Sequence, residues 1–163
     1  MSSIGAEPTQ NRFMPNTFTQ IYFHLIFAVQ GRNNLISEQW EVQLHKYITG
    51  IVTNKSQKMI AINGMPDHIH ILVGCKPDCI LSDLVRDIKS NSSRWINNKK
   101  FKNIRFEWQK GFGAFSVSHS KLDVVGNYIK NQKEHHLKKS FKNEYVEFLE
   151  NNEIEFNEKY IFK

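Results

Sequence analysis

The strongest constraint on the fold is a run near the middle of the chain, His-Ile-His-Ile-Leu-Val, in which imidazole and apolar side chains alternate. Successive side chains of a β-strand point to opposite faces of a sheet, so a period of two predicts a strand with one buried face. Ile69, Ile71 and Val73 would share the face that enters the core. His68 and His70 would share the other face, which we expect to be open to solvent or ligand.

The segments on either side of this strand predict an α+β domain. Strands are expected where aromatic and β-branched residues concentrate, and helices where apolar residues recur at helical spacing behind a serine. The expected strands span residues 17–30, 58–63, 68–74, 105–109 and 115–118, and the expected helices span 37–55, 82–96, 121–136 and 142–150. A turn joins the second and third strands into an antiparallel hairpin. This order resembles a split β-α-β (ferredoxin-like or RRM-like) antiparallel sheet with helices on one face.

Length and composition predict a single globular domain. The chain has 163 residues, of which 40% are hydrophobic, and that is enough to bury a core. We expect the domain to span residues 17–150, after a flexible leader at 1–16 and before an acidic tail at 151–163. The leader lacks the pattern of a signal peptide, and the longest apolar stretch is too short to cross a bilayer. Two cysteines are too few for a disulfide scaffold, so we expect a cytoplasmic protein with no membrane partner.

The net charge of +6 is concentrated in the middle of the chain. The basic residues of this region are Arg86, Lys89, Arg94, Lys99, Lys100, Lys102, Arg105 and Lys110. Clustered Lys and Arg release counterions from phosphates, so this basic segment predicts a nucleic-acid partner and these residues as its binding surface. Solvated helix faces are the alternative explanation of the same charges.

The histidine pair is a candidate metal site. Two imidazoles side by side at the start of a strand can hold one divalent ion, although such a pair can equally form hydrogen bonds alone. Cys75 and Cys79 follow closely, and two cysteines with two histidines can hold structural zinc. Cys75 lies at an odd offset from the histidines, however, and would point to the opposite face of the strand.

A second group of polar residues lies on the helix expected at 121–136. Tyr128 and Gln132 are four residues apart and therefore share one helix face. A phenol can act as the nucleophile of phosphoryl transfer, and the amide oxygen of glutamine can join histidines on a metal ion. The alternative is a tyrosine half-buried at the edge of the core beside a solvated glutamine.

A third pattern alternates aromatic residues with glycine and polar residues between the basic segment and the tyrosine helix. Exposed aromatics beside basic side chains can stack on unpaired bases. We nevertheless expect Phe106, Trp108 and Phe115 to occupy core positions of strands. Gly111 and Gly113 are expected to serve backbone geometry or the close approach of a ligand.

Taken in order, three motifs resemble the single-tyrosine transposases of the His-hydrophobic-His superfamily, which belong to insertion sequences of the IS200/IS605 type. The motifs are Met65–His70, Trp108–Ser118 and Tyr128–His136. Each motif alone is weak, but their combination is specific and the resemblance covers residues 17–149, nearly the whole chain.

The resemblance implies a site and a reaction. It implies that His68, His70 and Gln132 bind a divalent metal ion, Mg²⁺ or Mn²⁺, and that Tyr128 is the catalytic nucleophile on a C-terminal helix added to the sheet. Tyr128 would attack a phosphate of single-stranded DNA, leaving a 5′-phosphotyrosine link and a free 3′-hydroxyl. Attack by the 3′-hydroxyl of another strand would rejoin the DNA without ATP.

The resemblance also implies partners. Members of this family are homodimers that recognise hairpins near the ends of the element, and the tyrosine helix of one subunit can complete the histidine site of the other. The basic segment is the expected hairpin surface, and no small-molecule substrate is expected. Two alternatives remain: a domesticated relative that nicks palindromes of its host genome, and a nucleic-acid-binding module without catalytic activity. The combination of His68, His70 and Tyr128 argues against the binding module.

Overall fold

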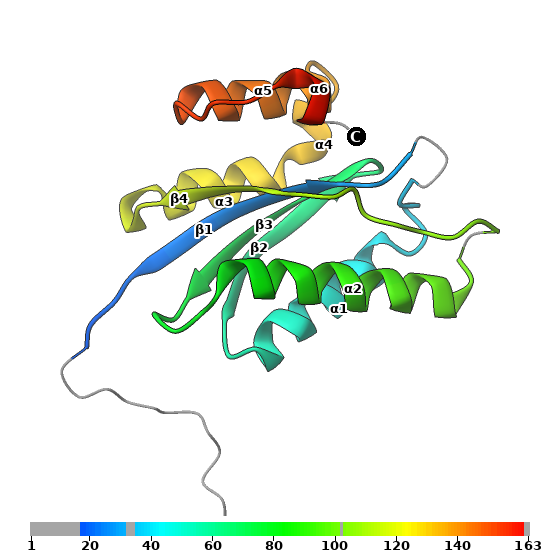
Figure 1. Ribbon diagram of the computed structural model, residues 1–163, viewed down its shortest axis with the longest axis horizontal. Helices are drawn as coiled ribbons and strands as arrows, with labels where there is room; N and C mark the ends of the chain where they lie inside the picture. The colour runs from blue at the N-terminus through cyan, green and yellow to red at the C-terminus, as the bar shows by residue number, and fades with distance from the viewer. Residues whose placement is uncertain (1–16, 32–34, 102, 162–163) are drawn as a thin grey trace, which may run out of the picture.

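A four-stranded antiparallel sheet forms the centre of the protein (Figure 1). The structure is a computed structural model that describes residues 17–31, 35–101 and 103–161. The strands are β1 (Ile21–Ala28), β2 (Lys58–Met65), β3 (His68–Cys75) and β4 (Gly113–Val117), and they lie in the order β2-β3-β1-β4. With the helices between them, they confirm the α+β prediction of a split β-α-β arrangement.

The central strand β3 pairs with β1 on one side and with β2 on the other. A tight turn closes the β2–β3 hairpin, as predicted from the sequence. All of β3 except one glycine is buried, because helices cover both faces of the sheet. Ile69, Ile71 and Val73 lie in the main hydrophobic core, as predicted, and His68 and His70 lie together on the opposite face.

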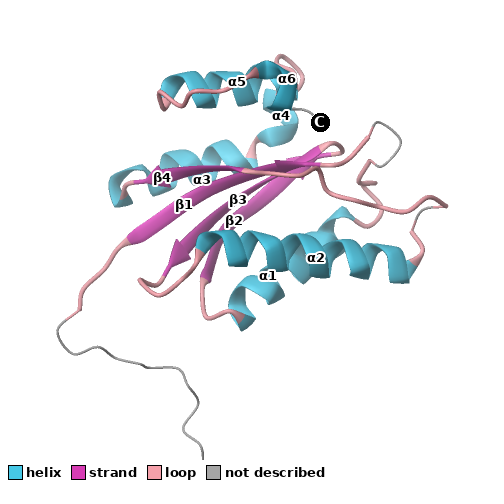
Figure 2. Cartoon of the chain, viewed as in Figure 1, coloured by secondary structure: helices cyan, strands magenta, loops and turns pink. Residues whose placement is uncertain are grey.

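The helices form two layers, one on each face of the sheet (Figure 2). The core face is covered by α1 (Glu41–Asn54) and α2 (Leu81–Lys99), and the histidine face by α3 (Leu122–Lys130) and α5 (Phe141–Asn151). Shorter helices complete the second layer: η1 (His119–Lys121), α4 (Gln132–His135) and α6 (Glu158–Ile161). The histidine face is therefore buried, and the expectation that it would be open was wrong.

The two long helices of the second layer divide that face between them. Ile129 of α3 is buried with Ala61 and Leu72, which belong to β2 and β3. Leu149 of α5 is buried with Ile26 of β1 and with a phenylalanine of β4. Each helix therefore has its own small hydrophobic cluster, and polar side chains fill the space between the two clusters.

The helix expected at 121–136 is interrupted, because Asn131 adopts φ −97° and ψ 21° between α3 and α4. The amide of Asn63 donates to the carbonyl of Lys130, which satisfies a backbone group at the break. Beyond the break, Gln132 is completely buried rather than solvated. The interruption thus places the glutamine of the predicted site inside the protein.

The prediction of a strand at residues 105–109 was wrong, because this segment forms only an isolated β-bridge between Trp108 and Val29. The backbone amide and carbonyl of Phe106 are bonded to the side chain of Asn97 instead of a neighbouring strand. The indole of Trp108 donates to the hydroxyl of Ser92 at 2.9 Å. Both aromatic side chains are buried, so their predicted place in the core is confirmed although the strand is absent.

The two ends of the chain differ in what the structure describes. The leader expected at 1–16 lies outside the described residues. Much of the acidic tail is described, and Phe156 packs against the hydrophobic cluster beneath α5. None of the helices within the described ranges is long and apolar enough to span a membrane.

Replacing Gly64 by alanine should destabilise the hairpin that positions the histidines. A Cβ atom at this position would collide with the backbone carbonyl of His68, which cannot move without disturbing the strand pair. We expect a loss of roughly 1–3 kcal/mol in the free energy of unfolding, measured by urea denaturation. Gly50 is the matched control, since a Cβ there meets nothing within 4 Å and alanine favours the helix by about 0.5–1 kcal/mol. Equal stability of the two variants would contradict this account.

Candidate metal and nucleophile site

His68 and His70 start β3 with fully buried rings that face α3 and α5. The Nδ1 atom of His68 lies 2.7 Å from a carboxylate oxygen of Asp67, the residue that precedes it. A carboxylate that holds one ring nitrogen orients the other toward a ligand, an arrangement common around metal-binding histidines. Burial alone would lower the pKa of His68, but its bonds to Asp67 and Glu144 outweigh burial and raise it.

His70 is held by a third histidine from the neighbouring strand. The Nε2 atom of His24 lies 2.8 Å from Nδ1 of His70, so one ring donates to the other. Burial lowers the pKa of His24 to about 3 and that of His70 to about 4, so both rings are neutral at pH 7. The neutral imidazole is the form that binds metal ions. Because the Nδ1 atom of His70 is hydrogen-bonded to His24, the Nε2 atom of His70 is the one directed into the site.

The segment after the break in the tyrosine helix adds two further side chains. The amide oxygen of Gln132 lies 3.3 Å from Nε2 of His68 and 3.0 Å from Nε2 of His136. Gln132 is completely buried, and His136 directly follows α4. Both groups therefore reach the histidine pair from the side of the sheet that α3 covers.

Glu144 of α5 lies at the centre of these groups and is only 2% exposed. Its Oε1 atom lies 2.9 Å from Nε2 of His70, 3.3 Å from that of His136 and 3.4 Å from that of His68. Burial alone would raise the pKa of Glu144, but hydrogen bonds from His68 and His70 outweigh it and keep the pKa far below its usual range. The side chain is therefore a carboxylate, the form that binds cations.

Tyr128 reaches the same carboxylate from α3. Its hydroxyl donates to Oε2 of Glu144, and the amide of Gln132 also approaches that oxygen, at 3.3 Å. Burial and the hydrogen bond to Glu144 raise the pKa of Tyr128 well above its usual value. The phenol is therefore protonated at neutral pH and must lose its proton before it can act as a nucleophile.

These side chains form a possible metal site beside a tyrosine. One ligand atom from each of His68, His70, His136 and Glu144 lies within 4.8 Å of all the others. Imidazole nitrogens and a carboxylate oxygen suit first-row transition ions, and carboxylate and amide oxygens also suit magnesium. The arrangement can hold a divalent cation next to the hydroxyl of Tyr128.

The four residues identified from the sequence, His68, His70, Tyr128 and Gln132, thus lie together within one chain. The cysteines lie elsewhere: Cys75 is buried in the hydrophobic core on the other face of β3, as its odd offset indicated. The zinc site formed with the cysteines therefore has no support among the described residues.

Sequence reasoning missed four residues of the site, and three of them carried a local signal. Asp67 directly precedes the first histidine, His136 follows Gln132 at helical spacing, and His24 interrupts an apolar strand. Glu144 carried no such signal, because it lies in an acidic segment and enters the site only through the packing of α5.

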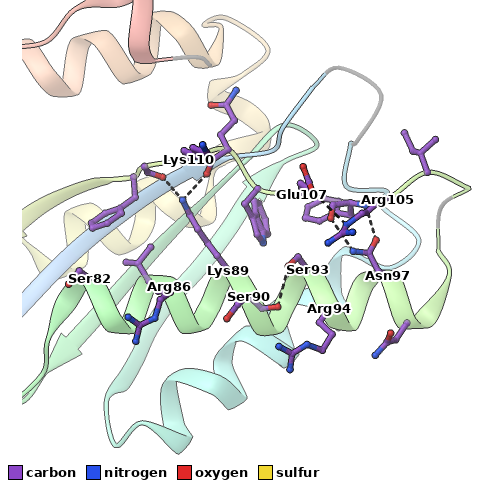
Figure 3. Close-up of a pocket in the computed structure, with 18 of the residues that line it drawn as sticks. Ser82, Arg86, Lys89, Ser90, Ser93, Arg94, Asn97, Arg105, Glu107 and Lys110 are labelled. Atoms are coloured by element: carbon purple, nitrogen blue, oxygen red, sulfur yellow. Dashed lines mark hydrogen bonds and ion pairs between the residues drawn. The ribbon is translucent and has the colours of Figure 1, made fainter.

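Most of the predicted DNA-binding residues surround a cleft of about 1000 Å³ between α2 and residues 103–112 (Figure 3). The basic residues that line it are Arg86, Lys89, Arg94, Arg105 and Lys110. Lys99 and Lys100 are exposed at the end of α2, and Lys102 lies outside the described residues. The cleft borders α2 and is therefore separated from the histidine cluster by the sheet.

Lys89 differs from the other basic residues of the cleft. Its ammonium group donates to the carbonyls of Gln109, at 2.8 Å, and of Gly111 (Figure 3). Burial lowers the pKa of Lys89 to about 8, and its Nζ lies 5.4 Å from the ring of Phe27. Lys89 therefore anchors the glycine-containing loop, and Gly111 adopts the positive φ of 81° that this loop requires.

An antiparallel sheet that carries buried histidines beside a tyrosine is the class of α+β protein that this structure defines, and the comparison with protein families identifies it. Residues 17–132 match the family model described as "Transposase IS200 like". The chain therefore belongs to the IS200-like transposase family, which confirms the resemblance seen in the sequence.

Individual relatives support this assignment. The chain is 24% identical over 118 residues to the ISDra2 transposase TnpA of Deinococcus radiodurans, a match that covers 69% of this chain and 84% of that protein. A solved structure from Deinococcus radiodurans R1, assigned as a transposase, has a TM-score of 0.58 and 24% identity over 72% of this chain and 94% of that one. A REP-associated tyrosine transposase bound to a REP hairpin has a TM-score of 0.56 and 18% identity, covering 71% and 68% of the two chains. The two structures show the same fold.

Replacing His24 by glutamine should weaken the acid sensitivity of the metal-free protein. Below pH 6.5 the unfolded chain protonates this histidine while the folded protein, with a pKa of about 3, does not, so stability is lost as the pH falls. This contribution amounts to roughly 1.4 kcal/mol per pH unit between these two pKa values. Glutamine does not titrate, and the free energy of unfolding between pH 6.5 and 4 should therefore fall less steeply than in the wild type. An unchanged slope in His24→Gln would contradict the low pKa of His24.

Proposed function

We propose that this protein cuts and rejoins single-stranded DNA at the ends of an insertion sequence through a 5′-phosphotyrosine link on Tyr128. One observation carries this proposal: the hydroxyl of Tyr128 and the Nε2 atom of His70 contact the two oxygens of a single carboxylate. The tyrosine therefore lies within one side chain of a cluster that can hold a divalent cation. A transposase with a nucleophile beside a cation site has the parts needed for phosphoryl transfer.

In the proposed reaction the phenolic oxygen of Tyr128 attacks phosphorus and the bond to the 3′-oxygen breaks. The tyrosine loses its proton, and the departing 3′-oxygen gains one to become a hydroxyl. The phosphotyrosine keeps a phosphodiester, so the 3′-hydroxyl of another strand can attack it and release Tyr128 without ATP. A metal ion held by His68, His70 and Gln132, with His136 and Glu144 close by, would stabilise negative charge on the phosphate oxygens.

The ligand set bears on the choice of metal. Mg²⁺ prefers oxygen ligands, whereas imidazole nitrogens favour transition ions such as Mn²⁺. Several imidazoles surround this site, and two of them are neutral at pH 7. We therefore expect Mn²⁺ to support the reaction at least as well as Mg²⁺.

We infer that the basic cleft beside α2 binds the DNA outside the site of cleavage. Its guanidinium and ammonium groups suit the backbone of a folded strand, and one structural neighbour was solved with a REP hairpin bound. Residues 109–112 also line a second cavity, of about 290 Å³, next to α5. Unpaired bases that leave the cleft would pass along this loop and stack on the partly exposed ring of Phe112, on the way to the cavity beside α5.

Two further features remain proposals. We propose a homodimer, since a reaction at two DNA ends needs two tyrosines, although within the chain Tyr128 and the histidines already lie together.

A domesticated enzyme that nicks host palindromes is the second candidate, and the resemblance in fold to the REP-associated transposase favours it. The two candidates share the chemistry and differ in the DNA sequence that they cleave.

The covalent intermediate provides the direct test. Full-length protein incubated with single-stranded oligonucleotides that carry the element ends and Mn²⁺ should form a protein–DNA adduct on a denaturing gel. Tyr128→Phe should abolish the adduct, a loss of at least about a thousandfold in rate, because no other group replaces the nucleophile. His68→Ala should also lose it, since the phosphate would no longer be polarised.

Tyr47→Phe is the matched control for this experiment. Tyr47 lies on α1, on the other face of the sheet, and stacks on Trp95. Its variant should form the adduct at the wild-type rate. An adduct that persists in Tyr128→Phe would disprove the proposed nucleophile, and the absence of any adduct with host palindromes and element ends alike would favour a binding module.

The cleft predicts a dependence of DNA binding on salt. Replacing Arg94 and Arg105 by glutamine should weaken the binding of hairpin DNA and reduce the slope of log K against log salt concentration by about 0.7–0.9 for each phosphate that is no longer neutralised. Fluorescence anisotropy at several salt concentrations measures this slope. Lys46→Gln on the exposed surface of α1 is the control and should leave the slope unchanged. If the control and the arginine variants behave alike, the DNA binds elsewhere.

A further inference from the structure

Glu144 contacts both halves of the candidate site. One carboxylate oxygen faces the nitrogens of His68, His70 and His136, and the other accepts the hydroxyl of Tyr128. We propose that Glu144 bridges the metal ion and the nucleophile: its Oε1 binds the metal ion together with the histidines, and its Oε2 holds the hydroxyl of Tyr128 beside that ion. The inference rests on the proposed function and assigns this chain a ligand and a positioning residue on α5.

The spacing of the donor atoms supports a shared ion. Adjacent ligands of an octahedral ion with bonds of about 2.1 Å are separated by about 3.0 Å. The Oε1 atom of Glu144 lies 2.9–3.4 Å from the three imidazole nitrogens, and the amide oxygen of Gln132 lies 3.0 Å from His136 and 3.3 Å from His68. These five distances therefore match the spacing of adjacent ligands of one small cation, and the donor atoms of the three histidines and Glu144 all lie within 4.8 Å of one another.

The charge around Glu144 also favours a cation. A buried carboxylate is costly unless an opposite charge or several hydrogen bonds compensate it. Among the described residues, the ion pairs of Glu144 involve histidines alone, with no lysine or arginine within 4 Å. A divalent ion would supply the positive charge that the surrounding side chains provide only in part.

The position of α5 is determined by close packing on the sheet. The ring of Phe141 stacks on His68 with centroids 4.0 Å apart, and Phe148 meets the ring of His24 edge-on at 5.1 Å. Gly113 permits this approach, because a Cβ atom there would lie 2.7 Å from the ring of Tyr145. The fold thus holds Glu144 in place through contacts of residues that precede and follow it on α5.

Glu144 and His136 lie beyond the part of the chain that matches the family model, which ends at residue 132. Their contribution therefore follows from the packing of this chain and is not carried over from the family. The opposite role for Glu144 is an internal anion that blocks the site and must leave before DNA enters. The two roles predict opposite effects of removing the charge.

Binding of Mn²⁺ to the DNA-free full-length protein tests the first half of the proposal. Isothermal titration calorimetry and the Mn²⁺ electron paramagnetic resonance spectrum should show one site in the wild type. Glu144→Gln should weaken the affinity at least tenfold and change the spectrum, because an anionic ligand is lost. Wild-type affinity in Glu144→Gln would overturn the proposal.

Adduct formation with single-stranded DNA at saturating Mn²⁺ tests the second half. Glu144→Gln should form the phosphotyrosine at least tenfold more slowly, and Glu144→Asp should recover part of the Mn²⁺ affinity but not the rate, since its shorter side chain cannot reach both partners. Faster adduct formation in Glu144→Gln would identify an internal block and overturn the proposal. Glu147→Gln is the control, because this exposed residue of the same helix pairs with Lys139 and should leave both measurements unchanged.

Melting temperatures separate lost metal binding from misfolding, and adduct formation by the wild type separates failure of the proposed function from failure of the bridging role. Metal-free melting temperatures of the Glu144 variants near that of the wild type exclude misfolding as the cause of lost binding. If the wild type binds Mn²⁺ through Glu144 but forms no adduct with any DNA, the proposed function fails while the ligand assignment stands. If the wild type forms the adduct and Glu144→Gln matches it in affinity and rate, the bridging role alone fails.

Discussion

Burial of two imidazoles at the centre of the sheet is the constraint on which the second layer of this protein depends. His68 and His70 are completely covered, so each ring nitrogen needs a polar partner inside the protein. The nitrogens nearer the sheet are satisfied by Asp67 and His24, which are neighbours in the turn and on the adjacent strand. The nitrogens directed away from the sheet meet Glu144 and other groups that the covering helices supply. A polar cluster therefore lies between the sheet and its second helix layer, where an apolar core would otherwise join them.

The covering helices bring different parts of this cluster. The helix that carries Tyr128 ends at a break, and the residues after the break turn inward so that Gln132 reaches His68. The next long helix packs on β1 and β4 through its own hydrophobic cluster and contributes the carboxylate. The positions of the phenol, the amide and the carboxylate thus depend on two separate packing contacts. Movement of either helix would change the distance between the phenol and the histidines.

The sheet separates two surfaces with different properties. On one side, imidazoles, a carboxylate and a phenol form a buried polar cluster. On the other side, α2 and the loop that Lys89 anchors form a basic cleft of about 1000 Å³. The loop of residues 109–112 borders both this cleft and the cavity beside α5. The proposed function therefore places recognition and chemistry on opposite faces of one small sheet.

The sequence by itself determined the sheet, its order of elements and half of the site, because these depend on short-range patterns. The alternation around His68 and His70 assigned their common face, and helical spacing paired Tyr128 with Gln132. Tertiary structure decided what local patterns do not encode: that the histidine face is covered, that the 105–109 segment is not a strand, and that Glu144 enters the site. The physical reason is that a carboxylate on an amphipathic helix has the pattern of a solvated surface residue until packing determines which face of that helix is buried.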